Sequence, residues 1–304
     1  MNQQGSATIL TLLVSAVILT VAIGFNWIVK EHLKAAEGLK VKAEAMMEAR
    51  STYDSLMYYI LTGQLTQKEI LFSREQNVLG VQRIPLGRTG IKLGNGVFVR
   101  VQDSSSLVSL VGSDVEVLKR LAAVLGAKPE TVSTLADSFS DWIDPDDLSR
   151  LNGAESSYYR FEGKAYGPRN FPLQYKDELA LIRGMDAELY AKMAPYLTVL
   201  PSLGFNPNAA DDATLMAYLD IDQEALDKLK GYITQQPVGT DAEMLTLTGK
   251  LMKRQDLGVN FFPSPFFEIA IEVGSPRVLY RLNAGVDVRP KAISPYGVVY
   301  WTEG

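Results

Sequence analysis

Length, charge and residue usage set the first limits on this chain. It has 304 residues, a net charge of −5 at pH 7, a pI near 5.2 and no cysteine. The acidity argues against nucleic acid as a main partner, and the lack of cysteine excludes disulfides, thiol catalysis and thiolate metal sites. The only histidine is His32. We therefore expect stability to come from packing, supplemented at most by a metal.

Residues 6–29 form an apolar segment without any ionisable side chain. As one helix the segment would be about 36 Å long, enough to cross the roughly 30 Å hydrocarbon core of a membrane. Two interpretations are a cleaved signal peptide and a plain N-terminal anchor. A third is a prepilin-type leader at residues 1–5, cut between Gly5 and Ser6, which keeps the whole helix. Chains with such leaders usually have a glutamate five residues after the cut, where this chain has Leu10.

Residues 30–62 are expected to continue the helix as a solvated stalk. Charges of both signs alternate from Lys30 to Arg50, and apolar residues recur at helical spacing from Leu33 to Ile60. The apolar stripe suits both an ordinary surface helix and a helix that packs against sister helices in an assembly. The turn at Gly63 is expected to end it.

The pattern changes to period two in residues 80–103. A strand from Ile91, an Asn-Gly turn and a strand from Val97 predict a β-hairpin. The glycines nearby do not form a phosphate-binding loop, because no helix with a Lys-Ser or Lys-Thr start follows them.

From residue 107 to about residue 250 the pattern is helical. Ser113 and Glu116 predict a capping box that opens a helix closed by Gly126. Pro129 is expected to open a second helix that ends at Ile143. Strands are predicted again at Phe266–Val273, Val278–Val288 and Val298–Thr302.

An internal repeat lies within the helical part, at an offset of 36 residues. It pairs Asp186 with Asp222, and each copy is predicted to be a helix, a three-residue turn and a helix. Such tandem hairpins are typical of helix-hairpin-helix modules, which bind phosphate through backbone amides at a helix N-terminus. Here carboxylates occupy both turns, and residues 128–230 hold 18 acidic and 10 basic side chains, a net charge of −8. We therefore expect the two helical hairpins to form but not to bind nucleic acid.

The central sequence resembles type II secretion system protein K, a minor pseudopilin family. The motifs that carry this resemblance are Asp141-Trp142-Ile143-Asp144-Pro145-Asp146-Asp147, Arg150-Leu151-Asn152-Gly153-Ala154-Glu155, Tyr158-Tyr159, Asp177-Glu178-Leu179, Gly184-Met185-Asp186, Pro195-Tyr196-Leu197-Thr198-Val199 and Asn206-Pro207-Asn208-Ala209-Ala210. The resemblance also covers the leader and the missing glutamate.

The resemblance implies an α+β pseudopilin fold: a long N-terminal transmembrane helix, an antiparallel sheet and a large inserted all-helical domain with two helix-hairpin-helix or SAM-like repeats. The expected organisation is a leader at 1–5, a transmembrane helix at 6–29, a periplasmic stalk at 30–62, a first β part at 80–103, the helical domain at 104–250 and a second β part at 255–304.

The resemblance further implies a protein of the bacterial inner membrane that sits at the pseudopilus tip and helps to start its assembly for protein secretion. Prepilin peptidase, membrane lipid, other minor pseudopilins and the inner-membrane secretion platform are the expected partners. Orientation is also taken from the resemblance, because the leader lacks positive charge while Lys30 and Lys34 follow the apolar segment. The rival functions are a membrane-tethered DNA-binding or DNA-uptake protein and a plain single-pass envelope scaffold.

A short acidic run offers the only candidate site chemistry. The oxygen ligands that calcium prefers are available from Asp141, Asp144, Asp146, Asp147 and Glu155, and the resemblance implies a structural calcium ion in the helical domain. The spacing is not that of an EF-hand, and the alternative is that these acids only cap helices and turns around Pro145. Trp142, Tyr158 and Tyr159 are expected in the core. No catalytic triad or paired-carboxylate hydrolase motif is present, so we do not expect an enzyme.

Overall fold

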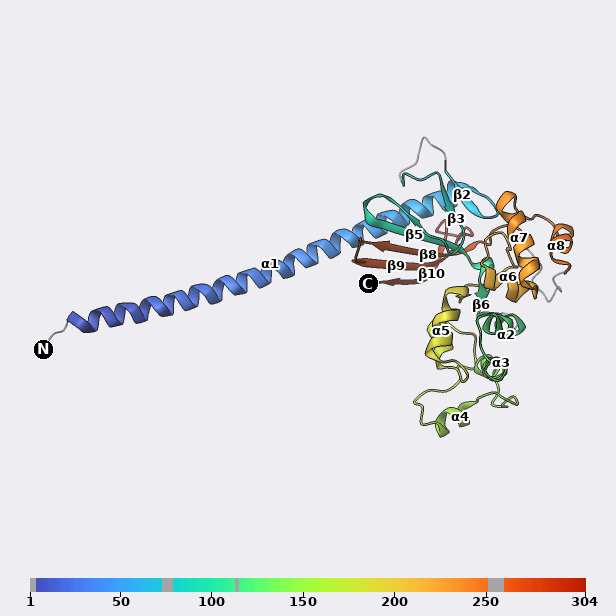
Figure 1. The fold of residues 1–304 in the computed structure, drawn as a ribbon, viewed down its shortest axis with the longest axis horizontal. Coiled ribbons are helices and arrows are strands. Elements are labelled where there is room, and N and C mark those ends of the chain that lie inside the picture. Colours follow the sequence, from blue (N-terminus) through green and yellow to red (C-terminus); the bar gives the residue numbers. More distant parts are fainter. Residues whose placement is uncertain (1–3, 73–78, 113–114, 251–259) are drawn as a thin grey trace.

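One helix dominates the shape of the molecule. The computed structural model describes residues 4–72, 79–112, 115–250 and 260–304, and it begins with α1, which runs without interruption over Gln4–Thr62. No proline occurs in this stretch, so nothing breaks the helical hydrogen bonds over about 88 Å. The helix ends where predicted, since the Gly63 N–H donates to the Tyr59 carbonyl at 2.6 Å. In Figure 1 α1 extends far from the rest of the fold, with the N-terminus at its free end.

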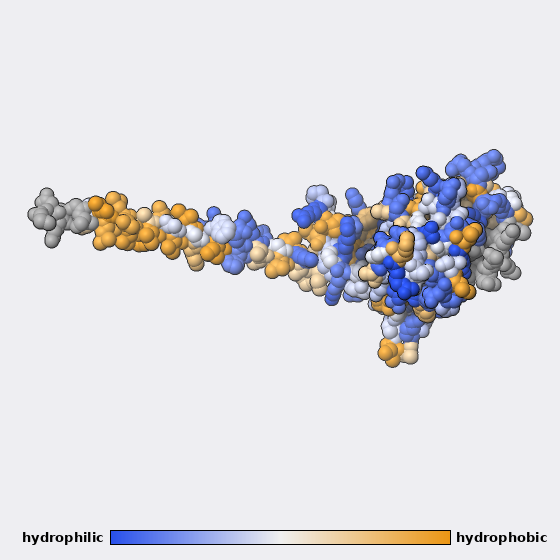
Figure 2. Space-filling view, turned by 90° about the horizontal axis from the view of Figure 1, so that it is seen from below, coloured by the Kyte–Doolittle hydropathy of each residue, from blue (hydrophilic) through white to orange (hydrophobic). Residues whose placement is uncertain are grey.

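The two ends of α1 differ in what surrounds them. The apolar side chains from Ile9 to Val29 are all exposed, and this helix alone in the described chain is long and apolar enough to span a membrane. Figure 2 shows this apolar end followed by a hydrophilic stretch. The other end is buried, with Ala49 and Leu56 at 0% exposure, because it packs on the sheet. A single helix therefore links the predicted membrane anchor to the folded core.

The sheet against α1 has five antiparallel strands in the order β10-β9-β8-β5-β4. Their bounds are β4 Ile91–Lys92, β5 Val97–Asp103, β8 Phe266–Val273, β9 Tyr280–Asp287 and β10 Gly297–Glu303. Alternate residues of β8 are buried, as expected for a strand with one face on the core. The predicted hairpin is confirmed, with β4 and β5 joined through the 3₁₀ turn η2 at Gly94–Gly96. The predicted C-terminal strands are confirmed as β8, β9 and β10.

A second, three-stranded sheet follows α1 and was not predicted from the sequence. It consists of β1 Gln64–Leu65, β2 Glu69–Leu71 and β3 Arg83–Pro85. A bridge between Leu86 and Val101 connects it to β5. Strands of two or three residues are too short to show an alternating pattern in the sequence.

The helical domain is inserted between two strands that pair with each other along their whole length. β5 and β8 are neighbours, with Val97 opposite Val273 and Asp103 opposite Phe267, so everything between them leaves and returns at one point of the sheet. The insertion contains α2 Val115–Val124, α3 Pro129–Ile143, α4 Ser156–Phe161, α5 Ala187–Met193, α6 Asp212–Leu219, α7 Gln223–Gln235 and α8 Asp241–Thr248. Figure 1 places these helices at the end of the molecule remote from the N-terminus.

Two predictions about this domain need correction. It is not all-helical, because β6 Val108–Ser109 and β7 Leu197–Thr198 pair in parallel inside it. The first repeat copy also departs from helix-turn-helix, because its first element is the 3₁₀ helix η4, Lys176–Leu181. The second copy does form two α-helices, α6 and α7. Of the predicted capping box, Ser113 lies outside the described residues, while the start of α3 at Pro129 is confirmed.

In the part of the chain that the structure describes, buried apolar side chains form three clusters. The first joins the inner end of α1 to both larger sheets, the second joins α2, α3 and α5, and the third holds α6, α7 and α8. Trp142 and Tyr159 are each 2% exposed in the second core, with ring centroids 5.5 Å apart in an edge-to-face contact. These two residues are core residues as predicted, while Tyr158 is half-buried.

Candidate cation site in the helical domain

The predicted acidic residues lie where α3 ends and α4 begins. Asp141 is in the last turn of α3, Asp144 caps its C-terminus, and Glu155 is the residue that precedes α4. The connection between these helices has no regular secondary structure. It brings Asp144, Asp146 and Glu155 together, with one carboxylate oxygen from each within 4.8 Å of the others. Asp141 and Asp147 are not members of this group.

Glu155 is the most unusual residue of the group. It is 1% exposed, and neither of its carboxylate oxygens has a hydrogen-bond partner. Burial and then the nearby carboxylates, led by Asp141 and Asp144, raise the pKa of Glu155 to about 7. Asp144 also has a buried oxygen, Oδ1, without a partner. A buried carboxylate without a compensating charge is costly, so these oxygens suit a cation.

Asp141 has a different partner, which was not predicted from the sequence. It is fully buried, and Arg150 Nη1 donates to its Oδ1 at 2.7 Å and to Asp144 Oδ2 at 2.5 Å. The backbone N–H of Arg150 also donates to Asp141. The two acids in turn raise the pKa of the Arg150 guanidinium through these hydrogen bonds. Asp141 is therefore neutralised by the chain itself.

The loop after Arg150 is held against α3 by further polar contacts. Asp137 Oδ2 accepts hydrogen bonds from the backbone and side-chain nitrogens of Asn152, each at 3.0 Å. A Cβ on Gly153 would overlap Asp141 Oδ2, so only glycine fits there. Arg183 donates to the Gly153 carbonyl at 2.8 Å and lies over the Tyr158 ring. These residues fix the loop without taking part in the carboxylate group.

Asn170 approaches the end of α3 from a distant loop. Its N–H donates to the Trp142 carbonyl at 2.9 Å, and its buried Oδ1 has no hydrogen-bond partner. Its backbone is left-handed, with φ of 55°, a conformation that asparagine tolerates better than most residues. No signal in the sequence links it to the acidic run.

The donor set of the group fits a hard cation. Asp144, Asp146 and Glu155 offer carboxylate oxygens only, and calcium takes six to eight oxygen ligands at about 2.3–2.6 Å. The alternative of simple capping accounts for part of the cluster, because Asp146 Oδ1 accepts from the Leu148 N–H at 2.9 Å. Capping does not account for Glu155, whose two carboxylate oxygens are buried without a hydrogen-bond partner. His32, the only histidine, lies on the exposed part of α1, away from this loop.

A second polar cluster fixes the point where the helical domain joins the sheet. Asp103, fully buried, accepts hydrogen bonds from Asn206 Nδ2 and from the N–H and Oγ of Ser264. Asn206 also donates to the Gln67 carbonyl at 2.9 Å, and Asn208 is bonded to the backbone of Val238 in both directions. Burial raises the pKa of Asp103. The loop that contains Asn206 and Asn208 thus precedes α6 and ties the domain to the sheet.

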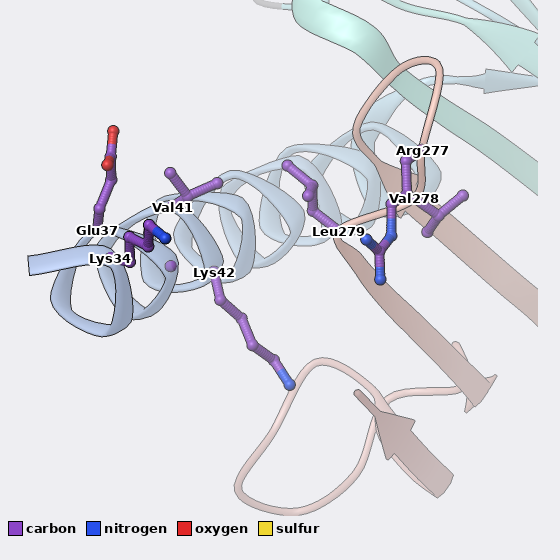
Figure 3. A pocket seen from close by; sticks show the side chains of 8 residues that line it. Lys34, Glu37, Val41, Lys42, Arg277, Val278 and Leu279 are labelled. Carbon is purple, nitrogen blue, oxygen red and sulfur yellow. The ribbon is translucent and has the colours of Figure 1, made fainter. Parts of the chain in front are cut away.

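An open groove lies between α1 and the turn from β8 to β9. Its apolar floor includes Val41 and Leu279, which are 37% and 43% exposed. Figure 3 shows Lys34, Lys42 and Arg277 around it, together with Glu37. Gly38 leaves space on the helix surface, since a Cβ there would meet nothing within 4 Å. The groove is therefore an exposed face of the stalk.

Comparisons with known proteins agree with these features. The family model for protein K of the type II secretion system matches residues 106–202. Type II secretion system protein K from Klebsiella pneumoniae is 27% identical over 235 residues, which cover 72% of this chain and 70% of that protein. These matches show that the chain is similar to type II secretion system protein K over most of its length.

A second K protein of a type II secretion system matches over a shorter length. The protein from Dickeya chrysanthemi is 34% identical over 127 residues, which are 40% of this chain and 34% of that protein. A solved structure of the GspK-GspI-GspJ complex from the enterotoxigenic Escherichia coli type 2 secretion system contains a chain with the same fold. It matches with a TM-score of 0.58 at 20% identity, over 90% of this chain and 98% of that chain.

Proposed function

We propose that this chain is a minor pseudopilin that sits at the tip of the pseudopilus and helps to start its assembly for protein export across the outer membrane. The observation that carries the proposal is the combination of α1 with the position of the inserted domain. α1 runs unbroken from an exposed apolar end to the sheet, and the helical domain lies at the opposite end of the molecule. A subunit stacked above would collide with this domain, so the top of an assembly suits it.

Maturation and location follow from the N-terminal segment. Prepilin peptidase would cut after Gly5 and leave Ser6 as the new N-terminus, while residues 6–29 stay in the inner membrane and the folded part lies in the periplasm. Leu10 is exposed on α1 in the position where chains with prepilin-type leaders usually have a glutamate. A subunit with no neighbour ahead of it has no amine to neutralise, so it does not need that carboxylate.

The proposed partners are other minor pseudopilins and the inner-membrane secretion platform. The solved relative is part of a complex of GspK with GspI and GspJ, which supports contacts of this kind. The exposed apolar residues Leu33, Leu39 and Met47 form part of the stalk stripe, and the groove at Gly38 lies on the same helix. We expect neighbouring subunits to pack along this stretch.

The N-terminal sequence of the mature protein tests the proposal. We would purify the full chain from membranes of a host with prepilin peptidase and of a matched host without it. The chain should begin at Ser6 only when the peptidase is present, and Gly5→Ala should block the cut. If Met1 is retained in both hosts, the chain is a plain anchored scaffold instead.

The DNA-binding alternative is disfavoured by the ends of the repeat helices. Asp186 accepts from the Leu189 N–H at 2.8 Å and Asp222 from the Ala225 N–H at 2.9 Å, so a carboxylate caps α5 and α7. A phosphate would have to displace these caps against their charge. We propose that the two repeats are helix-hairpin-helix or SAM-like units that serve as scaffold, and that the protein has a structural rather than an enzymatic role.

We also propose a structural calcium ion in the helical domain. Asp144, Asp146 and Glu155 would hold it, with the remaining ligands from other oxygens. The bound ion would supply positive charge to carboxylates that are buried without a partner, and so fix the connection between α3 and α4. Asp141 is not assigned to this ion because Arg150 already binds it.

A further inference from the structure

The groove between α1 and the turn from β8 to β9 continues the face of the helix that packs on the sheet. Gly38, Val41, Ala45 and Ala49 follow each other at steps of three or four residues, so they lie on one side of α1. Ala45 and Ala49 are 5% and 0% exposed in the core with the sheet, whereas Val41 is 37% exposed. The sheet therefore covers this side of the helix only as far as Ala45, and the groove is its uncovered continuation toward the apolar segment.

The rim of the groove gathers cations that the chain leaves without a partner. The other basic residues of this stretch of α1 have carboxylate partners, in the pairs Lys34–Glu31, Lys40–Glu44 and Arg50–Glu303. Lys42 and Arg277 are exposed and form no ion pair with any residue that the structure describes. Among the described residues that line the groove, Glu37 is the one acidic side chain (Figure 3). An apolar floor thus has a positive rim, although the chain has a net charge of −5.

The level of the groove suits a second helix that is anchored in the same membrane. The groove begins near Lys34, five residues beyond Val29 and so about 8 Å further along the helix axis. A neighbouring subunit with its own membrane anchor has the first turns of its stalk at this level. Gly38 carries no side chain, and small residues let two helix backbones approach closely.

Lipid head groups fit the positive rim less well. Lys42 lies thirteen residues beyond Val29, about 20 Å along α1, whereas the head groups of one leaflet extend roughly 5–8 Å beyond the hydrocarbon core. Arg277 lies beside the same stretch of the helix (Figure 3). These cations are therefore placed to meet the carboxylates of a protein rather than the phosphates of a membrane.

We propose that the groove receives the stalk helix of another minor pseudopilin. That helix lays apolar side chains on Val41 and Leu279 and directs a carboxylate to Lys42 or Arg277. This rests on the proposed function, in which the chain assembles with other minor pseudopilins. The apolar floor supplies burial, and the ion pairs at the rim set the register of the two helices.

The test measures binding of the full-length chain to the GspI and GspJ pseudopilins of its own secretion system, in a neutral detergent without anionic lipid. Lys42→Glu and Arg277→Glu should each raise the dissociation constant about tenfold, because a carboxylate then faces the partner's carboxylate. Added salt should narrow this difference. Lys40→Glu is the matched control: it makes the same charge change two residues from Lys42, on the opposite side of the helix. It should change the dissociation constant by less than about twofold.

The possible results distinguish a failure of the groove from a failure of the assembly. If the wild type binds neither pseudopilin, or pairs only with itself, the proposed assembly is wrong and the groove has no such partner. If the wild type binds both and the two groove variants bind equally well, the assembly stands and the inference about the groove is overturned. Equal weakening by Lys40→Glu overturns it as well, because net charge then acts instead of the groove. A loss seen only in vesicles that contain phosphatidylglycerol would make lipid the occupant and would also overturn it.

Discussion

Two buried carboxylates in different regions of the molecule have opposite electrostatic environments. Asp287, at the end of β9, accepts hydrogen bonds from Arg289 at 2.9 and 2.8 Å and from Lys291 at 2.5 Å. These contacts, with that to Arg289 the largest, lower its pKa despite burial. Glu155 in the helical domain has no such partner, and burial raises its pKa to about 7.

The difference shows how each region completes its own structure. At the end of β9 the chain itself supplies the cations, Arg289 and Lys291, that neutralise the buried Asp287. The connection between α3 and α4 buries more negative charge than Arg150 neutralises, and the proposed calcium ion would balance the remainder. We therefore expect the first region to be indifferent to calcium and the second to depend on it.

The largest expected effect tests the independence of the sheet region. Leu56 on α1 is fully buried, and Leu56→Ala should lower the free energy of unfolding by about 3 kcal/mol through lost burial and a cavity. Chemical denaturation with calcium and with a chelator should give the same loss. Leu39→Ala, at a residue that is 71% exposed, is the control and should change little. A loss that depends on calcium would show that the two regions are coupled.

Removal of calcium tests the dependence of the helical domain. At a calcium concentration of 100 times the dissociation constant, binding should stabilise the wild type by about 2.7 kcal/mol, measured as a shift of thermal unfolding relative to a chelator. Glu155→Gln should lose this shift. In chelator the same variant should be more stable than the wild type by about 1 kcal/mol, because a neutral amide replaces an unpartnered charge. If Glu155→Gln is less stable than the wild type both in calcium and in chelator, the Glu155 carboxylate is not an unpartnered charge in the metal-free protein.

The sequence predicted those helices and strands whose hydrophobic pattern extends over many consecutive residues. The bounds of α1 follow from its periodicity, the absence of proline and the turn at Gly63, and β8 follows from alternation over eight residues. β1 and β2 are too short to carry such a signal. β6 and β7 pair residues such as Val108 and Leu197, which are far apart in the chain, so their pairing depends on how the helices between them pack.

The candidate site was predictable as a set of residue types but not as an arrangement. Oxygen-rich composition identified five acids, and the structure brings three of them together. The separation of Asp141 from this group depends on Arg150, which reaches back nine residues from an irregular loop. The contribution of Asn170 to the end of α3 depends on a left-handed backbone in another loop. Neither feature has a periodic signature in the sequence.

Gly153 offers a test of the packing between the loop and Asp141. Gly153→Ala would place a Cβ against Asp141 Oδ2 without room for it, and the forced shift should cost about 2 kcal/mol. Gly231 is a helical glycine where an added Cβ would meet nothing within 4 Å, so Gly231→Ala should instead stabilise α7 by up to about 1 kcal/mol. Urea denaturation in calcium compares the two. Equal effects would mean that the loop can move away from Asp141 without cost.

The smallest expected effect concerns Asp287 and its dependence on pH. Because the folded state lowers the pKa of this group, its ionised form stabilises the fold above the unfolded pKa, near 3.9, and this contribution is lost as the pH falls below that value. Asp287→Asn should therefore cost about 1 kcal/mol at pH 7, a modest value because Arg289 and Lys291 are about half exposed. The cost should shrink when unfolding is measured at pH 3, and calcium should not alter it. A cost that stays constant between pH 7 and pH 3 would mean that Asp287 acts through its shape and hydrogen bonds rather than through its charge, and would remove the electrostatic contrast with Glu155.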